Sequence, residues 1–507
     1  MIPSRSLLRA AMAVLAALYV PLAAPALAQP VTFQGQTFTN QGLVGVARVP
    51  SNAVDKFGDT VSLGSGMSVL PGSWHKRGDG SYIGRFLMLP DRGWNTQGTV
   101  DYAGRLHRYE AILHPYYGNG PTTQDQLSLT YKTSNLFHEP KKNTTGIDPL
   151  GVRPASGNMP PLPIAPNGKI AVDDEGVVYP GDGTMWISDE YGPYVYHYSA
   201  PGKLIGVIRP PEAFVPKRLS NGVPVDDFSA NAPPQGQTYN KGNPVSGRQN
   251  NQGAEGLAIS PDGKTLFILL QSALIQDLKA TSAATIRTSR RNARMLAYDI
   301  SGPTPALTAE YVVQLPQYPS PTVTGEILTA AQSEIRALND HQFLIISRDS
   351  GAGHGLALAG SVYRGVDLID ISGATNIANA ATGTDYDVPQ NPVAPNGVLN
   401  PAIIPAAYQP FIDINDATQL AKFGLHNGAP NDNNNLVEKW EGLAVLPAFD
   451  KQNPNDYFLV VASDNDFITQ DGHMVGQPYA DASGINNDTL VLVYRVTLPN
   501  YQAPVKP

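Results

Sequence analysis

The sequence predicts an all-β fold, a β-propeller of six blades with four antiparallel strands each. Three observations predict it. A short motif led by glutamate recurs along the chain, and each copy opens a series of short apolar stretches typical of strands. The 48 glycines and 45 prolines are dispersed, as turns between many strands require. Long helical patterns are scarce, and the two clearest cover residues 272–291 and 416–423.

The first 28 residues have the pattern of a secretory signal peptide. Arg5 and Arg9 precede an apolar run, and the run ends in the small-residue sequence Ala26-Leu27-Ala28, which resembles a cleavage site. The alternative, a retained membrane anchor, is disfavoured because the apolar run is short. We therefore expect a periplasmic or extracellular protein in which residues 29–507 form one propeller domain.

The composition argues against several classes of function. The formal net charge is −8 and the charges are scattered, which disfavours binding to nucleic acid or to an anionic membrane. The chain has no cysteine, so disulfides and thiol chemistry are excluded. An acidic chain is better suited to binding cations. We expect a monomer that acts on a small anionic or ester substrate.

The recurring motif is a glutamate followed by a short apolar stretch. Four copies begin "EGVV", "EGLAIS", "EIRAL" and "EGLAVL", and a degenerate copy reads "SGMSV". The first three glutamates are roughly 80 residues apart, and a loop around 373–435 lengthens the last interval. A polar turn, a second apolar stretch and a further pair of such stretches follow each copy. Each unit therefore contains about four strands.

Five units are visible in this way, and we expect a sixth within residues 99–165. That segment contains the strand-like stretches "RLHRYEAILHP" and "QLSLTYKTSNLF". The N-terminal stretch "FTNQGLVGVARV" is expected to pair with the C-terminal "TLVLVYRV" and close the ring. The alternative folds are a two-sheet sandwich or two separate β domains, and both leave the repeated motif without a role.

The repeated glutamates predict a metal site. The innermost strand of each blade lines the central channel of a propeller, so residues that open this strand converge. Converging carboxylates repel one another unless a cation or protons lie between them. Calcium takes 6–8 oxygen ligands, whereas the chain offers no thiols for zinc. We predict calcium bound by Glu175, Glu255, Glu334 and Glu441. The alternative is that each glutamate bonds main-chain amides of the next blade and latches the blades together.

A second set of polar residues ends the second strand of several units. Carboxylates at these positions can act as a base or bind metal, and arginines beside them can hold an anionic group. A histidine in the loop "GAGHG" can donate a proton. The predicted catalytic residues are Asp189, Glu190, Asp349, His354 and Asp464, and the predicted substrate-binding residues are Arg92 and Arg348. The alternative for these clusters is ordinary turn chemistry, and for the histidine a surface position.

Several stretches, in this order along the chain, resemble the esterase-like phytase family of secreted bacterial proteins. They are "DEYGPYVYHY", "EGLAISPDGKTLFIL", "RMLAYDI", "SRDSG" and "WEGLAVLP". The resemblance extends over residues 63–496 and implies a β-propeller related in shape to calcium-dependent propeller phytases. It also implies hydrolysis of phosphoesters or carboxylic esters. Arginines for a multiply charged substrate are few, so phytate itself is not the expected substrate.

Two functions follow from these observations. The first is a calcium-dependent hydrolase of phosphoesters or related esters, in which the metal activates a water molecule. The second is a calcium-stabilised propeller that binds a ligand or a protein partner without catalysis. No Gly-x-Ser-x-Gly nucleophile motif between a strand and a helix supports a serine hydrolase. Convergence of acids, arginines and His354 in one pocket favours the hydrolase.

Overall fold

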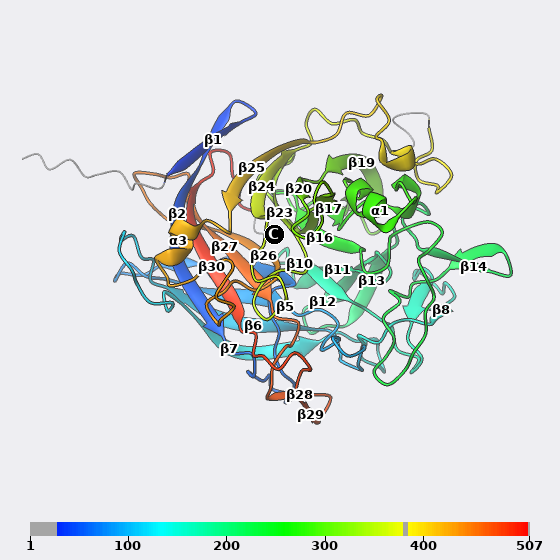
Figure 1. Ribbon diagram of the computed structural model, residues 1–507, viewed down its shortest axis with the longest axis horizontal. Helices are drawn as coiled ribbons and strands as arrows, with labels where there is room; N and C mark the ends of the chain where they lie inside the picture. Colours follow the sequence, from blue (N-terminus) through cyan, green and yellow to red (C-terminus); the bar gives the residue numbers. More distant parts are fainter. Residues whose placement is uncertain (1–27, 379–383, 505–507) are drawn as a thin grey trace, which may run out of the picture.

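The computed structural model describes residues 28–378 and 384–504, and most of these form antiparallel sheets arranged around a central axis (Figure 1). The predicted signal peptide falls almost entirely outside the described residues. Five large sheets form the blades. Their innermost strands are, in chain order, β3 (Gly66–Val69), β10 (Asp174–Val178), β16 (Ala254–Ile259), β22 (Ala331–Ala337) and β26 (Lys439–Pro447).

Each blade continues outward from its innermost strand by antiparallel pairing. The outer strands are β5 (Tyr82–Leu89), β6 (Arg105–Leu113) and β7 (Leu127–Leu136), with β4 (His75–Lys76) beside β5, in the first blade; β11 (Thr184–Asp189), β12 (Val195–Ser199) and β13 (Leu204–Ile208) in the second; β17 (Thr265–Leu270), β18 (Asn292–Asp299) and β19 (Ala306–Gln314) in the third; β23 (Gln342–Arg348), β24 (Arg364–Asp370) and β25 (Ala407–Asp413) in the fourth; and β27 (Asp456–Asp464), β30 (Thr489–Thr497), β2 (Gln36–Val49) and β1 (Gln29–Phe33) in the fifth.

The propeller has five blades, so the prediction of six was wrong. The two strands expected to begin a sixth blade are β6 and β7, which pair with β5 as the outer half of the first blade. Six units spaced by roughly 80 residues would fill the chain after residue 28. Long connections between blades, such as 209–253 and 414–438, take up the difference.

The fifth blade closes the ring as predicted. Strand β2, near the N-terminus, pairs with β30, near the C-terminus, over most of its length, and β30 pairs with β27. The two ends of the chain therefore share one sheet. Closure of this kind is how a propeller protects the edge strands that an open arrangement would expose.

The hydrophobic core lies between neighbouring blades. The rings of Phe267 on β17 and Phe343 on β23 meet edge to face with centroids 4.8 Å apart, which joins the third and fourth blades. Tyr82 on β5 and Phe458 on β27 meet in the same way at 4.8 Å and join the first and fifth. Apolar side chains thus fill the faces between sheets, while the ends of the inner strands carry polar residues around the axis.

The remaining elements lie in the connections. They are the strands β8 (Gly151–Arg153), β9 (Leu162–Ile164), β14 (Lys217–Ser220), β15 (Val223–Asp226), β20 (Gln317–Pro319), β21 (Ile327–Thr329), β28 (Gly472–Met474) and β29 (Gln477–Tyr479), and the short helices η1 (Ile275–Asp277), α1 (Ala283–Ser289), η2 (Pro395–Gly397) and α3 (Ala417–Ala421). The two predicted helical segments contain α1 and α3, which are shorter than expected. Within the described ranges, no helix has the length and apolar character needed to cross a membrane.

Candidate active site in the central cavity

Four of the five inner strands, β10, β16, β22 and β26, contain a β-bulge that sets the direction of the repeated glutamates. At a bulge, two residues on one strand oppose a single residue on its neighbour. The extra residue is Glu255 in β16 and Glu441 in β26, and in β10 the irregularity covers Glu175 and the glycine after it. In β22 the extra residue is Ser333, so Glu334 occupies the position that glycine holds in the other three blades.

This shift of one residue separates Glu334 from the other three glutamates. Its Oε1 atom accepts hydrogen bonds from the main-chain N–H groups of Leu257 in the neighbouring blade, at 2.9 Å, and of Ile335, at 2.8 Å. A shift of one position turns a side chain to the other face of a strand. Glu334 therefore has the geometry of a latch between blades, which was the alternative considered for all four residues.

The other three glutamates line one cavity of about 270 Å³ at one end of the central channel. Two rings of equivalent positions contribute to its lining. The bulge positions form the first ring, and the residues that end the second strands form another, in which Arg348 pairs across from Ala331 and Asp464 across from Lys439. The cavity is lined by Asp91, Arg92, Asn95, Asp173, Glu175, Glu190, Asn251, Gln252, Glu255, Gln271, Arg348, Ser350, Glu438, Lys439, Glu441 and Asp466.

One acidic group in this cavity has the geometry of a metal site. Asp173, Glu175 and Glu190 are all buried, and one carboxylate oxygen from each lies within 4.8 Å of the other two. The Oε2 atom of Glu175 is buried and finds no hydrogen-bond partner among the described residues, and the same holds for Oε2 of Glu255. An unpaired buried carboxylate is costly, so these atoms call for a cation or a proton.

Burial and neighbouring carboxylates oppose ionisation in this group. Burial, and then the carboxylates of Glu255 and Asp173, hold the pKa of Glu175 well above its usual range. Burial also raises the pKa of Asp173 to about 7. The donors are all carboxylate oxygens, which suit a hard cation such as calcium and do not suit a metal that prefers sulfur or imidazole.

The two predicted substrate-binding arginines both reach the cavity, and both are already paired. Nη1 of Arg92 lies 2.6 Å from the carboxylate of Asp173 and also donates to Asn251 at 2.5 Å. Nη2 of Arg348 lies 2.6 Å from the carboxylate of Glu441. The arginines therefore stabilise the acidic cavity from within, and they join neighbouring blades.

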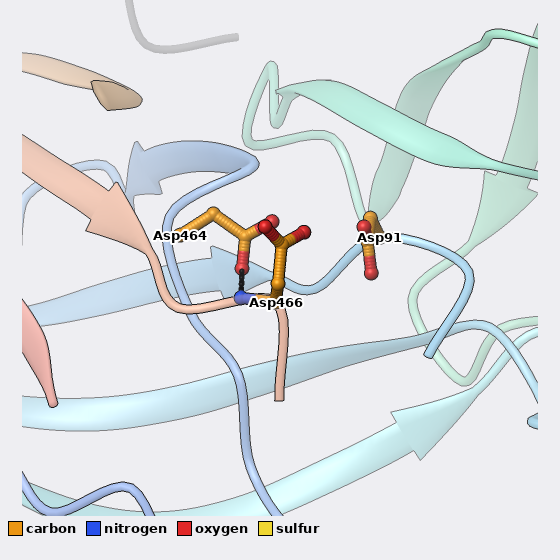
Figure 2. A group of neighbouring side chains, drawn as sticks. All are labelled: Asp91, Asp464 and Asp466. Atoms are coloured by element: carbon orange, nitrogen blue, oxygen red, sulfur yellow. Dashed lines mark hydrogen bonds between the residues drawn. The ribbon is translucent and has the colours of Figure 1, made fainter. Parts of the chain in front are cut away.

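A second acidic group consists of Asp91, Asp464 and Asp466, whose side chains Figure 2 shows at the end of β27 and in the loop after β5. Nζ of Lys439 lies 2.8 Å from Asp464, 3.0 Å from Asp466 and 3.5 Å from Asp91. Burial acts to raise the pKa of Asp464, but the ammonium outweighs it and the pKa falls below its usual value. This group therefore already contains a positive charge.

Of the five predicted catalytic residues, Glu190 lines the cavity and Asp464 holds Lys439, which also lines it. Asp189 accepts hydrogen bonds from the main-chain N–H groups of Asp173, Tyr191 and Gly192. This is the turn chemistry considered as the alternative.

The other two predicted residues lie in the loop after β23 and are not among the residues that line the cavity. The carboxylate of Asp349 accepts from the Ser361 hydroxyl at 2.7 Å and from the Val362 N–H at 2.6 Å. His354 is buried, with 9% of its surface exposed, and neither ring nitrogen has a partner among the described residues. The structure thus brings acids and arginines together without His354.

Sequence reasoning missed Asp173, Lys439 and Glu438, all of which line the cavity. Asp173 and Lys439 each stand two residues before a repeated glutamate, in the patterns "DDEG" and "KWEG". The sequence therefore contained a pattern that could have identified Asp173 and Lys439. Side chains two residues apart along a strand share a face, and the bulge comes after these two positions.

Comparisons with known proteins identify the family of the chain. A family model described as "Phytase-like: Esterase-like activity of phytase" matches residues 82–467. A protein of Arthroderma benhamiae named "Uncharacterized secreted protein" is 40% identical over 468 residues, which cover 86% of this chain and 88% of the relative.

The solved structures that match the chain are more distant. A luciferin-regenerating enzyme is 11% identical with a TM-score of 0.27, and the match covers 91% of this chain and 97% of that one. A virginiamycin B lyase from Staphylococcus aureus is 9% identical with a TM-score of 0.24, over 89% of this chain and 99% of that one. The family model, by contrast, matches more than half of the chain, and the protein therefore belongs to the phytase-like family.

Proposed function

We propose that the protein is a secreted hydrolase that binds a divalent cation, calcium by its donor set, at Asp173, Glu175 and Glu190 and cleaves ester bonds in the central cavity. The observation that carries the proposal is the buried, unpaired Oε2 atom of Glu175 beside two further carboxylates. When bound, calcium would polarise an ester oxygen and lower the pKa of a bound water.

The chain's own residues supply positioning and proton transfer. Arg92 holds Asp173 by two hydrogen bonds, from its main-chain N–H at 3.2 Å and its guanidinium at 2.6 Å. Gln271 donates to one oxygen of Glu255 and leaves the other without a partner. Burial and the charge of Glu190 hold the pKa of Glu255 well above its usual range, which favours the protonated form of this carboxyl. Glu255 is the proposed proton carrier.

The charges of the lining favour a weakly charged substrate. Eight carboxylate residues and three cationic residues line the cavity, and the arginines are already bonded to acids. One bound calcium ion would leave the cavity negative. Phosphate monoesters, which carry two negative charges, would be repelled. Within the class of esters, carboxylic esters and phosphodiesters fit better.

Two observations support a secreted location. The N-terminal 28 residues have the pattern of a signal peptide, and the relative from Arthroderma benhamiae, which shares 40% of its residues, is named as a secreted protein. Calcium is abundant outside the cell, so the proposed site and the proposed location agree.

The test measures hydrolysis of p-nitrophenyl acetate, bis-p-nitrophenyl phosphate and p-nitrophenyl phosphate before chelation, after chelation and after calcium is restored. We expect chelation to abolish cleavage of the first or second substrate and calcium to restore it. Glu175→Gln should reduce kcat/KM about 100-fold. Glu334→Gln makes the same chemical change outside the cavity and should retain activity.

Two results would contradict the proposal. Activity that survives both chelation and Glu175→Gln would show that the acidic group is not the catalytic centre. Stoichiometric calcium binding with no hydrolysis of any of the three substrates would instead support a calcium-stabilised propeller that binds a ligand or partner.

A further inference from the structure

The ammonium group of Lys439 lies among acidic side chains where a metal ion would be expected. Its Nζ atom is 2.8 Å from Asp464, 3.0 Å from Asp466 and 3.5 Å from Asp91, and these three residues have carboxylate oxygens within 4.8 Å of one another. A fourth carboxylate oxygen, Oε2 of Glu441, lies 3.7 Å from Nζ. This oxygen is buried and has no hydrogen-bond partner among the described residues.

The position of Lys439 in its blade is the position of Asp173 in the second blade. Each stands three residues before the glycine that follows the bulge. Lys439 faces Asp464 across the β26–β27 ladder. Asp173 faces Glu190 in the same way, and the Glu190 N–H donates to the Asp173 carbonyl at 3.1 Å. The fold therefore repeats one arrangement twice, with an acid at the first position in one blade and a cation in the other.

The charge of the residue at this position decides whether the acidic group requires a bound cation. In the second blade an acid faces an acid, and the oxygens of Asp173, Glu175 and Glu190 gather with one buried oxygen unpaired. In the fifth blade the lysine directs its N–H groups into the acids. An ammonium ion bonds carboxylates at about 2.8–3.0 Å and a calcium ion at about 2.3–2.6 Å, so one small cluster of oxygens accommodates either.

We propose that Lys439 takes the place of a divalent cation among Asp91, Asp464, Asp466 and Glu441, so that this group binds no ion in the native protein. A neutral side chain at position 439 opens a divalent-cation site there. The cavity is thereby limited to chemistry with one metal ion, because a two-metal mechanism needs two ions about 3.5–4 Å apart. The replacement of an ion by Lys439 goes beyond the proposed function and does not depend on it, whereas the limit to one metal ion rests on the proposed function.

The test counts calcium ions per chain by equilibrium dialysis and elemental analysis, after chelation and return of calcium. Lys439→Met is expected to bind one more ion per chain than the native protein, whatever the native number is. Lys439→Arg keeps the positive charge and should show no increase. Lys439→Met combined with Asp464→Asn and Asp466→Asn should lose the extra ion.

Circular dichroism shows that each variant is folded, and Lys439→Met is purified in calcium to protect it. An unchanged count in folded Lys439→Met would overturn the inference. A second measurement uses the native lysine and does not depend on that variant. Asp466→Asn alone should leave the native count unchanged, and a loss of one ion would show that the group binds calcium despite Lys439. A native count of zero would refute the proposed function and leave this inference intact.

Discussion

The carboxylate of Glu441 on the innermost strand of the fifth blade lies 2.6 Å from the guanidinium of Arg348, which ends the second strand of the fourth blade. Both side chains are almost fully buried, and Nε of the same arginine donates to the Ser333 hydroxyl at 3.1 Å. One arginine thus joins two blades at the cavity and partly offsets the burial that raises the pKa of Glu441.

Removal of this arginine should destabilise the protein strongly. Arg348→Met leaves the Glu441 carboxylate buried without its partner, at an expected cost of about 3 kcal/mol in the free energy of unfolding. Urea unfolding measures it, and Arg348→Met combined with Glu441→Gln should recover part of the loss. The control is Arg287→Met, which breaks a pair with Glu326 whose arginine is 44% exposed. That change should cost less than about 1 kcal/mol, and equal losses in the two variants would contradict the assigned role.

Calcium should stabilise the native protein against heat through the Glu175 group. A ligand that binds only the folded state at 100 times its Kd adds about 2.7 kcal/mol. We expect chelation to lower the Tm and added calcium to restore it. Glu175→Gln should lose most of this response, and Glu334→Gln should keep it, because its oxygen bonds the Leu257 and Ile335 amides and lies outside the cavity. If both variants lost the calcium-dependent rise in Tm equally, the glutamates would act through contacts between blades rather than through a calcium site at Glu175.

His107 on β6 should make the protein sensitive to acid. Its ring is fully buried, Nδ1 lies 2.7 Å from the Ser134 hydroxyl, and burial together with the Arg105 charge lowers the pKa of His107 to about 3. Because the unfolded chain takes up this proton near pH 6.5, the stability from neutral His107 is complete above pH 6.5. It is lost as the pH falls from 6.5 towards 3.

His107→Leu tests this by urea unfolding at pH 7 and pH 5. Between these values the native protein should lose about 2 kcal/mol more than the variant. Comparison with the variant removes the contribution of buried carboxyls, whose raised pKa values act in the opposite direction. An identical pH dependence in the two proteins would show that His107 is accessible to protons in the folded state.

Glycines near the start of the inner strands should be required for the close approach of blades. A Cβ atom on Gly66 would lie 2.3 Å from the main-chain oxygen of Glu175 in the next blade, and one on Gly176 would lie 2.7 Å from the main-chain oxygen of Glu255. Gly66→Ala should therefore lower the free energy of unfolding by about 2 kcal/mol or more. Gly302→Ala, where no atom lies within 4 Å, is the matched control and should have little effect. A Gly66→Ala protein as stable as the control would contradict the close contact.

Local patterns in the sequence predicted the strands and their order. The motif that opens at Glu175, Glu255 and Glu441 does begin an inner strand in each case, and the pairing of β2 with β30 follows from two complementary apolar stretches. The number of blades could not be predicted in this way. Blade number depends on which stretches pair, and β6 and β7 resemble the strands of a separate blade until their pairing with β5 is known.

The sequence by itself determined that this protein is an acidic, cysteine-free chain of repeated β units with glutamates at the start of its inner strands. Only the tertiary structure decided which of them share a cavity. Glu334 opens an apolar stretch as the others do, although isoleucine rather than glycine follows it, and the bulge in β22 lies one residue earlier and turns it to the neighbouring blade. Side-chain direction in a strand alternates with every residue, and the position of a bulge is set by pairing between strands, so a linear pattern cannot record it.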